Sequence, residues 1–443
     1  KEVSRKFIHI MVGNWVFLYP RYNQLWSLLF VPIVFIIINT FSLKYALIEA
    51  MERDNDEGYG TIYYAISLTV LSYLAFTLQQ PILLYVGTLI MTYGDGFAAI
   101  IGKKYGKNLK FKKFPEKSLP GSLTVALVSF IVTLLSLTIL IEGITILPRI
   151  IISIITSIFA VYLELIGNKG LDNLILPIGT SLITYLSVFD FSWQYLIVLM
   201  VMIFVLGFAY FKESITLDGG IAALIIGASI YQLSDATLLW NLLAFFIIGS
   251  VISKITNKTK DQAEQNQEFG GPRNYKQVFA NALPSTLIVW YCHIVPENSD
   301  YIVLAYILFA TSFADTFASE LGMLSSGKVV SIINFKPLLT GVSGGVSVIG
   351  TLSGLLGSVI SSFFVFNYGF NIMILVALLG FMGMLIDSLL GAIFQRKYLN
   401  DSGRLVDYYP GNNHVQSGYS LISNNTVNVL TLCIVMFLSV LII

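Results

Sequence analysis

The sequence contains few charged residues. Only 12% of its 443 residues are Asp, Glu, Lys or Arg, whereas 56% are hydrophobic. Soluble globular domains are about a quarter charged, so this composition excludes an ordinary soluble protein and predicts many membrane-spanning helices. Acidic and basic residues nearly balance, at a formal net charge of +1. This balance gives no indication of a nucleic-acid partner.

Cysteine and histidine are also scarce. The chain has two cysteines, Cys292 and Cys433, and three histidines. The cysteines lie far apart in apolar segments without metal-ligand spacing, so we expect packed thiols. Three histidines are too few for a histidine-rich metal site.

Apolar runs predict an all-α integral membrane protein. A helix needs about 20 residues to cross the hydrocarbon, and we expect fifteen such helices in two distantly related bundles. Their approximate ranges are 7–19, 24–41, 60–78, 81–101, 119–141, 149–166, 174–190, 195–211, 219–234, 236–253, 277–292, 301–324, 342–366, 371–394 and 425–443.

The distribution of positive charge predicts the orientation of these helices. With a cytosolic N-terminus, every Lys and Arg except Arg21 and Arg149 falls on the cytosolic side, as positive residues prefer. The loops 102–118 and 325–341 then face the cytosol, where nucleotides are. We therefore expect a multi-pass cell-membrane protein whose active sites face the cytosol.

An internal repeat marks two halves, which we place at 1–190 and 191–443. Each copy has an Asp in an apolar segment, then Ala, Gly and a loop Lys. The copies are Asp95, Ala98, Gly102 and Lys117, and Asp315, Ala318, Gly322 and Lys336. An acid, a lysine and nearby glycines can hold a metal and a phosphate. The repeat therefore indicates two related active sites.

Asp95 and Lys117 are the strongest candidates of the first half. An Asp in a membrane helix costs ~2.5–3.5 kcal/mol on insertion scales, so Asp95 needs a partner or a cavity. Lys117 and Ser118 stand at the start of a helix, where free N–H groups bind phosphate. Candidate phosphate-binding residues are Arg5, Lys6, Lys117, Ser118 and Gly121, and candidate metal ligands are Asp95, Glu164, Asp172 and Asn173.

Some of these residues have plainer explanations. Arg5 and Lys6 also fit an interfacial anchor, and Asp172 fits a helix N-cap. His9 lies one turn deeper in an apolar helix than Arg5 and is harder to explain by structure alone. It is a candidate catalytic residue beside Asp95.

The second half carries its own acids and a Gly- and Ser-rich loop. Acids inside apolar helices are costly as mere structure, so we expect Asp315 to be catalytic and its neighbours to hold metal. The candidate metal ligands are Asp315, Glu320, Asp387 and Asn425, and the candidate phosphate-binding residues are Lys336, Thr340 and Gly341. The run 340–347 suits a phosphate nest, although Gly and Ser also serve close helix packing.

Residues 1–190 resemble the phytol kinase and dolichol kinase family, membrane lipid kinases that use CTP. The resemblance is carried by Arg5-Lys6-x-x-His9, Gly94-Asp95-x-x-Ala98-x-x-x-Gly102, Glu116-Lys117-Ser118-x-x-Gly121-Ser122 and Glu164…Asp172-Asn173-Leu174…Pro177. It departs at Pro120, where many members have an acid or a small residue. It implies Mg²⁺ on the acids, CTP phosphates on Arg5, Lys6 and Lys117, and an alcohol or phosphate near His9.

Residues from about 205 to 443 resemble the family of plant phytyl-phosphate kinase, formerly a domain of unknown function. The matching stretches are Asp315-Thr-x-Ala318-Ser-Glu320-x-Gly322, Lys336 to Thr351, Asp387-Ser-Leu-Leu-Gly391-Ala-x-x-Gln395 and Asn424-Asn425-x-x-Asn428. Many relatives have Asn-Asp where this chain has Asn424-Asn425. The missing carboxylate weakens a metal role there.

Together the two resemblances imply a bifunctional isoprenoid salvage kinase. The first half would phosphorylate phytol or a related isoprenoid alcohol with CTP and Mg²⁺, and the second would phosphorylate the isoprenoid monophosphate. Two alternatives remain open: a cytidylyltransferase that moves CMP from CTP to a lipid phosphate, and a transporter or flippase of phosphorylated lipids. The sequence leaves the oligomeric state undetermined, and beyond these substrates we expect the lipid bilayer as a partner.

Overall fold

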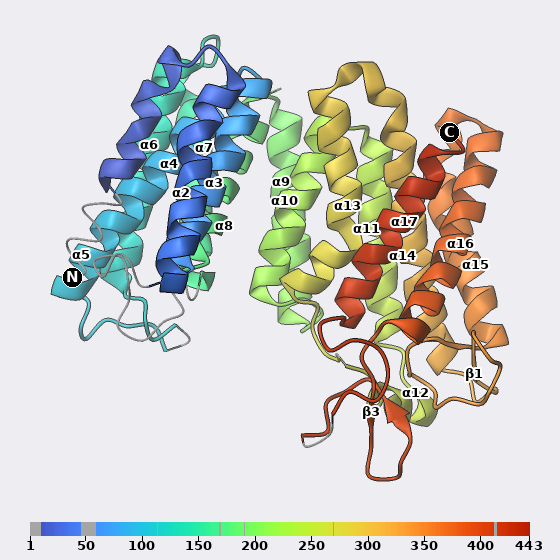
Figure 1. Cartoon of the computed structure of the whole chain (residues 1–443). Helices are drawn as coiled ribbons and strands as arrows, with labels where there is room; N and C mark the ends of the chain where they lie inside the picture. The colour runs from blue at the N-terminus through green and yellow to red at the C-terminus, as the bar shows by residue number, and fades with distance from the viewer. Residues whose placement is uncertain are drawn as a thin grey trace. The chain divides into compact units, whose positions relative to one another are not determined.

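The chain forms two compact units, Lys1–Ser192 and Trp193–Ile443, called here the first and second units. Within each unit, helices run roughly side by side (Figure 1). The expected site residues Arg5, Lys6 and His9 lie outside the described part of the chain. The computed structural model describes residues 10–45, 59–112, 114–167, 170–189, 191–268, 270–411 and 414–443.

The described part of the first unit is helical. Its elements are the 3-10 helix Asn14–Arg21, α2 (Leu25–Tyr45), α3 (Gly60–Thr77), α4 (Ile82–Leu89), the π-helical turn Ile90–Asp95, α5 (Gly96–Tyr105), α6 (Leu119–Leu140), α7 (Ile146–Ile166) and α8 (Asp172–Phe189). Because α4, the π-helical turn and α5 follow one another directly, they act as one long helix, Ile82–Tyr105.

The second unit combines long helices with two small hairpins. Its helices are α9 (Trp193–Phe211), α10 (Leu217–Leu233), α11 (Ala236–Ser253), α12 (Lys258–Glu264), α13 (Tyr275–Ile294), the 3-10 helix Pro296–Tyr301, α14 (Ile302–Met323), α15 (Val348–Ser362), the 3-10 helix Phe363–Tyr368, α16 (Phe370–Ile393) and α17 (Asn424–Val440). Strand β1 (Val330–Ser331) pairs antiparallel with β2 (Gly345–Val346), and β3 (Tyr398–Leu399) with β4 (Leu405–Val406). The hairpins and α12 gather at one end of this unit's helices (Figure 1).

Eleven helices in the described ranges are long and apolar enough to cross a membrane. Leu217–Leu233 and Asn424–Val440 are apolar but shorter. The structure thus confirms a mostly helical chain with many candidate spans but does not support the expected count of fifteen. The expected helix 342–366 is among the eleven but begins later, at Val348, because its first residues form β2 and the loop before α15. One expected span that is not among the eleven is α13, where Gln277 and Asn281 interrupt the apolar surface.

Short polar side chains cap the helices that begin at the polar loops. Ser118 Oγ accepts a hydrogen bond from Gly121 N at 3.4 Å at the start of α6. Ser347 Oγ accepts one from Gly350 N at 3.0 Å at the start of α15. Each cap satisfies an N–H group that lacks a partner within the helix and stabilises it by about 1 kcal/mol. The caps therefore fix where each loop meets its helix.

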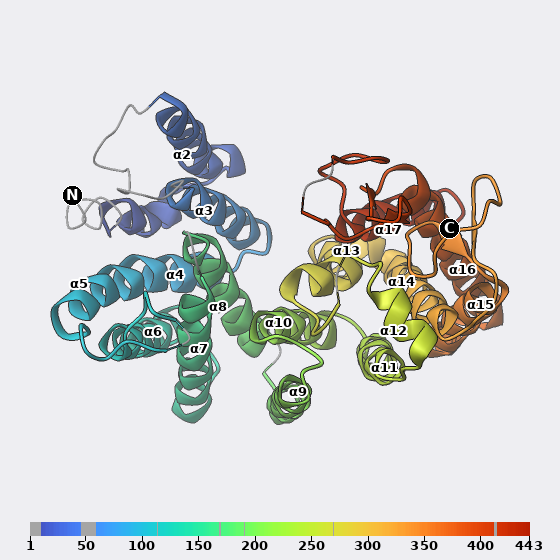
Figure 2. The ribbon, with the colours of Figure 1, turned by 90° about the horizontal axis from the view of Figure 1, so that it is seen from below.

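The two helices that carry the repeated Asp are the most buried candidate spans. Within an apolar window of 18 residues, 61% of Ile82–Tyr105 and 72% of Pro296–Met323 is buried, more than in any other candidate span. Helix α14 contacts α11, α13, α15, α16 and α17, and Figure 2 shows it among them. Asp95 and Asp315 therefore sit on the central helices of their units.

Glycines let the second unit's central helix pack closely against its neighbours. A Cβ on Gly357 of α15 would lie 2.8 Å from the Phe313 carbonyl oxygen of α14. One on Gly380 of α16 would lie 2.6 Å from Ala310 Cβ of α14. Small residues at such crossings allow helix backbones to approach in membranes. This packing holds the acid-bearing faces of α14 and α16 at a fixed distance.

Candidate active sites

In the first unit, one lysine joins acids from two other helices. Lys117 Nζ lies 2.8 Å from Glu164 Oε1, near the end of α7, and 3.5 Å from Asp172 Oδ2, at the start of α8. Lys117 itself directly precedes the Ser118 cap of α6. Three of the residues predicted from the first-half motifs are thus brought together by three different segments.

The surroundings of Lys117 keep it positively charged. Burial alone lowers the pKa of its ammonium, but the carboxylates of Asp172, Glu164 and Asp95 raise the pKa above its ordinary value. Glu164 is buried and also accepts a hydrogen bond from Ser122 Oγ at 3.3 Å. The result is a fixed cation beside the N–H groups at the start of α6, but its charge is already matched by Glu164 and Asp172, so an arrangement for phosphate there needs a metal ion as well.

Asp95 lies at the end of a π-helical turn, Ile90–Asp95, inside the central helix. Such turns are rare and occur frequently at functional sites. The charge of Asp95 acts on Lys117, so Asp95 belongs to the same electrostatic neighbourhood. Asn173 follows Asp172 in the first turn of α8, and its side-chain amide donates to the Gly170 carbonyl oxygen at 3.0 Å.

The repeated motif packs in the same way in both units. A Cβ on Gly121 would lie 3.4 Å from the Ala98 oxygen and 3.8 Å from Gly102 Cα. A Cβ on Gly350 would lie 3.1 Å from the Ala318 oxygen and 3.7 Å from Gly322 Cα. Both glycines are the residues whose N–H group is capped by Ser118 or Ser347.

This packing corrects the register of the repeat. Ser118 corresponds to Ser347 and Gly121 to Gly350, so the expected pairing of Lys117 with Lys336 does not hold in the structure. Lys336 lies exposed in the hairpin between β1 and β2, and its side chain does not line the polar cavity of the second unit. The position before the Ser347 cap is Val346.

The second unit contains a polar cavity of about 250 Å³. Its walls come from α13, α14, α16 and α17, from the first turn of α15, and from the loops that precede α13, α15 and α17. Predicted site residues that line it are Asp315, Glu320, Thr340, Gly341, Asp387 and Asn425. All second-half candidates except Lys336 therefore meet at one cavity.

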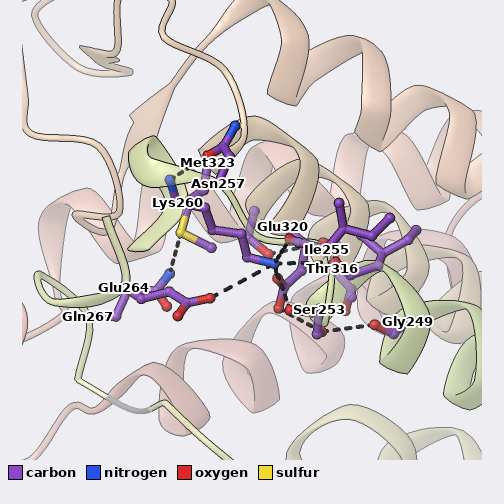
Figure 3. Close-up of polar contacts among 12 residues, drawn as sticks. Gly249, Ser253, Ile255, Asn257, Lys260, Glu264, Gln267, Thr316, Glu320 and Met323 are labelled. Atoms are coloured by element: carbon purple, nitrogen blue, oxygen red, sulfur yellow. Dashed lines mark hydrogen bonds and ion pairs between the residues drawn. The ribbon is translucent and has the colours of Figure 1, made fainter. Parts of the chain in front are cut away.

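Glu320 has a structural partner inside this region. Its Oε2 lies 2.7 Å from the ammonium of Lys260, a fully buried residue of α12. Lys260 also donates to the carbonyl oxygens of Ile252 at 3.3 Å, Ser253 at 2.8 Å and Ile255 at 3.1 Å (Figure 3). These contacts hold α12 against the end of α11 with Glu320 as counterion. Asp315 and Asp387 are thus the cavity's stronger candidates for metal binding.

Asp407 and Arg273 line the same cavity and were missed by sequence reasoning. Asp407 Oδ2 accepts hydrogen bonds from Ser343 N at 2.8 Å and Gln395 Nε2 at 3.2 Å. Burial raises the pKa of Asp407 to about 7, and the charge of Glu268 also raises it. The hydrogen bond from Ser343 N and the charge of Lys397 lower the pKa but do not offset this effect. A signal was present in the sequence, because Asp407 is an acid between apolar and aromatic neighbours.

The donor set of the second cavity suits Mg²⁺, which binds one or two carboxylates together with phosphate oxygens. Asp315 and Asp387 line the cavity. The Oδ1 atom of Asn428 also belongs to a lining residue, is buried and has no hydrogen-bond partner among the described residues. In the described ranges, no group of three His, Cys, Asp or Glu side chains is placed to hold a metal. A bound Mg²⁺ would therefore need phosphate oxygens as further ligands.

Comparison with known proteins identifies the class of membrane protein. The family model "Integral membrane protein DUF92" matches residues 200–436, a little over half of the chain. A phytol kinase from Synechocystis is 32% identical over 190 residues, which cover 42% of this chain and 78% of the relative. Protein PGR from Arabidopsis thaliana is 30% identical over 259 residues, which cover 52% of this chain and 90% of the relative.

A probable chloroplastic phytol kinase 1 from Glycine max is 32% identical over 145 residues, which cover 30% of this chain and 47% of the relative. No solved structure matches the chain. From the family match and these relatives, the chain belongs to the DUF92 family of integral membrane proteins and is a phytol-kinase-like membrane protein.

Proposed function

We propose that the protein is a two-step isoprenoid kinase. The first unit transfers the γ-phosphate of CTP to a prenol such as phytol, and the second phosphorylates the resulting monophosphate to the diphosphate. One observation supports this most: both units pack an Asp-bearing central helix against a serine-capped helix start, in the same register. Phosphoryl transfer depends mainly on positioning and charge neutralisation, which one scaffold can supply twice.

The assignment of steps to units draws on the relatives. The DUF92 match lies within the second unit. The motifs of residues 1–190 resemble those of phytol kinases, and a phytol kinase from Synechocystis is among the relatives of the chain. We therefore assign the alcohol kinase step to the first unit and the phosphate kinase step to the second.

In the first unit, Lys117 binds phosphates of CTP together with Arg5 and Lys6. Asp95, Glu164 and Asp172 would hold Mg²⁺ only together with phosphate oxygens, because no three of the described acids are placed to hold a metal by themselves. Glu164 and Asp172 already share Lys117, and with Asp95 these acids outnumber the lysine charge, so phosphate binding there needs the added charge of Mg²⁺. Metal and nucleotide therefore bind this site together, and His9 orients the alcohol.

In the second unit, Asp315 and Asp387 hold Mg²⁺, and the loop with Thr340 and Gly341 lies against the nucleotide phosphates. The backbone of Gly341 has a φ of +89°, the left-handed conformation that favours glycine and turns this loop beside the cavity. Because the monophosphate is anchored in the bilayer by its tail, it need only move laterally between the sites. Both sites face the cytosol, an orientation supported by the distribution of Lys and Arg.

The test is the fate of two labels on CTP, with purified protein, Mg²⁺ and phytol or geranylgeraniol. A kinase puts the γ-phosphate label into the lipid and leaves the α-phosphate label in CDP. If the α-label enters the lipid instead, the protein is a cytidylyltransferase. If no nucleotide labels the lipid, the kinase proposal fails and lipid movement without phosphorylation becomes the account to pursue.

A further inference from the structure

Next to its polar cavity, the second unit has a smaller, apolar cavity of about 60 Å³. Helices α9, α10, α11 and α13 form it, and Figure 2 shows α10 between α9 and α13 with α11 beside it. Apolar side chains make up most of its wall, among them Met202, Leu206, Ile226, Leu242, Phe246 and Val278. A cavity of this size and character takes a short length of hydrocarbon, not a nucleotide.

The apolar cavity and the polar cavity share three lining residues, Arg273, Gln277 and Asn281. Gln277 and Asn281 are one turn apart on α13, and Arg273 directly precedes the Asn274 cap of that helix. The shared residues therefore form a polar boundary between a hydrocarbon-like space and the space that holds Asp315 and Asp387.

Arg273 is held firmly at this boundary. Its guanidinium lies 5.4 Å from the centre of the Phe245 ring. A Cβ on Gly249 would lie only 2.9 Å from its Nη2 atom, so the glycine leaves the room that the guanidinium occupies. Its backbone is also fixed, because its N–H donates to the Ser214 oxygen at 3.1 Å and its oxygen accepts from Thr216 N at 3.0 Å.

Among the described residues, Arg273 is the one cationic side chain that lines the polar cavity, and it has no ion pair within 4.0 Å there. Nearby cations are engaged elsewhere. Lys260 pairs with Glu320, Arg396 pairs with Glu268, and Lys397 donates to carbonyl oxygens at the end of α16. A cavity rich in acids thus has a single guanidinium available for an anion, and Arg binds phosphate through paired hydrogen bonds.

We propose that the second unit binds a singly phosphorylated prenol with its first isoprene units in the apolar cavity and its phosphate on Arg273. The inference rests on the proposed function of this unit, since it places that substrate. The remainder of the tail extends into the bilayer. Gln277 and Asn281 lie along the boundary and orient the head group toward Asp315 and Asp387.

This placement gives a balanced reaction without a proton donor or acceptor. Near pH 7 a phosphate monoester is largely a dianion. One of its oxygens forms a bond to the γ-phosphorus of CTP while the bond from that phosphorus to the β–γ bridging oxygen breaks. The electron pair and negative charge leave with CDP. Arg273 therefore serves to bind and orient the attacking phosphate, and no base is needed.

The experiment measures KM and kcat for conversion of prenyl monophosphate to diphosphate by the full-length protein. Arg273→Gln should raise KM for prenyl monophosphate about 10- to 100-fold, the range for a lost charge-assisted hydrogen bond. Ala223→Phe fills the apolar cavity. It should raise KM for prenyl monophosphate but leave KM unchanged for a short monophosphate that lacks the tail. Arg404→Gln, in an exposed loop, and Ile247→Phe, on the outer face of α11, are the matched controls.

The possible failures can be told apart. If the unmodified protein converts no monophosphate, the proposed function of the second unit fails. If the unmodified protein converts the monophosphate and both variants keep the wild-type KM for it, the inference is overturned. If phosphatidic acid in vesicles competes as well as prenyl monophosphate and is equally sensitive to both variants, the cavity holds lipid phosphates generally and the commitment to a prenol is wrong. Thermal midpoints of each variant show whether the fold is retained.

Discussion

At the first site, Lys117 is a cation shared by Glu164 of α7 and Asp172 of α8. No local pattern requires this lysine, among the seven from Lys103 to Lys117, to point inward. The sequence singled it out because it precedes the Ser118 helix start, and the structure shows that this start aims it at the two acids. The position of a lysine directly before a helix cap therefore distinguishes a candidate site lysine from the solvated lysines around it.

Replacing Lys117 should remove the first step. We expect Lys117→Ala to lower the rate of prenol phosphorylation by about 100-fold or more, because the nucleotide loses a charge partner and two acids lose their counterion. Conversion of supplied monophosphate should continue, which shows that the second unit is intact. Lys107→Ala, an exposed lysine of the same loop, is the control. A normal first-step rate in Lys117→Ala would remove this residue from the site.

Asp407 ties the loop before α15 to the loop before α17, through Ser343 N and Gln395. Its folded pKa of about 7 lies above the ordinary 3.8. Its contribution to stability is therefore fully present below about pH 4, falls as the pH rises toward 7, and is constant above that. Ionised and buried, the carboxylate then destabilises the second unit.

Asp407→Asn should abolish this dependence. The midpoint difference is the thermal midpoint of the variant minus that of the wild type. It should be larger at pH 8 than at pH 5 by on the order of 5 °C. The measurement is a set of melting curves of detergent-solubilised protein, with Asp401→Asn at an exposed loop position as control. An equal midpoint difference at both pH values would show that Asp407 does not titrate in this range.

At the scale of elements, close packing around α14 sets the geometry of the second cavity. A Cβ on Gly380 would meet Ala310 Cβ at 2.6 Å, so α16 would have to move away from α14. Asp315 lies on α14 and Asp387 on α16. The separation of these carboxylates therefore depends on a glycine seven residues before Asp387.

Gly380→Ala should lower the thermal midpoint of the protein and slow the second step. Overpacking costs about 1–3 kcal/mol, and displacement of Asp387 should lower the second-step kcat several-fold with the first step unchanged. Gly207→Ala is the matched control, since no atom lies within 4 Å of a Cβ at that position. If both variants behave alike, close packing of α14 and α16 does not shape the site.

The elements also show how far the sequence could lead. The Asp95 and Asp315 helices could be found in the sequence because an acid in an apolar run is conspicuous. The capped helix starts could be found because Ser-x-x-Gly follows a polar loop. Lys336 was chosen by its sequence separation from Asp315. In the structure, Lys336 lies in the β1–β2 hairpin and does not line the cavity. Arg273 and Lys260 lie in the polar segment 254–276, and their partners are set by tertiary packing that no local pattern encodes.

At the scale of the whole molecule, each unit repeats one arrangement of five helical segments. The contacts among α3, the helix Ile82–Tyr105, α6, α7 and α8 recur among α13, α14, α15, α16 and α17. In this correspondence α7 with Glu164 matches α16 with Asp387, and the start of α8 at Asp172 matches the start of α17 at Asn424. We interpret the units as products of duplication whose side chains have since diverged.

On this interpretation, divergence accounts for the different cations at the two proposed sites. The first presents Lys117, fixed by Glu164 and Asp172. The second presents Arg273 from a loop outside the repeated segments. An alcohol brings no charge to its site, whereas a phosphate monoester brings about two negative charges near pH 7. Under the proposed function, a separate guanidinium for the acceptor phosphate is what the second reaction would require and the first would not.

The central claim is that two units act in sequence, and one measurement tests it most directly. Asp95→Asn and Asp315→Asn proteins are each given CTP, Mg²⁺ and a prenol, then prenyl monophosphate, and the lipid products are resolved. Asp95→Asn should form nothing from the prenol yet convert the monophosphate, while Asp315→Asn should accumulate monophosphate. Loss of both steps in both variants, or diphosphate at the wild-type rate in Asp315→Asn, would contradict the account.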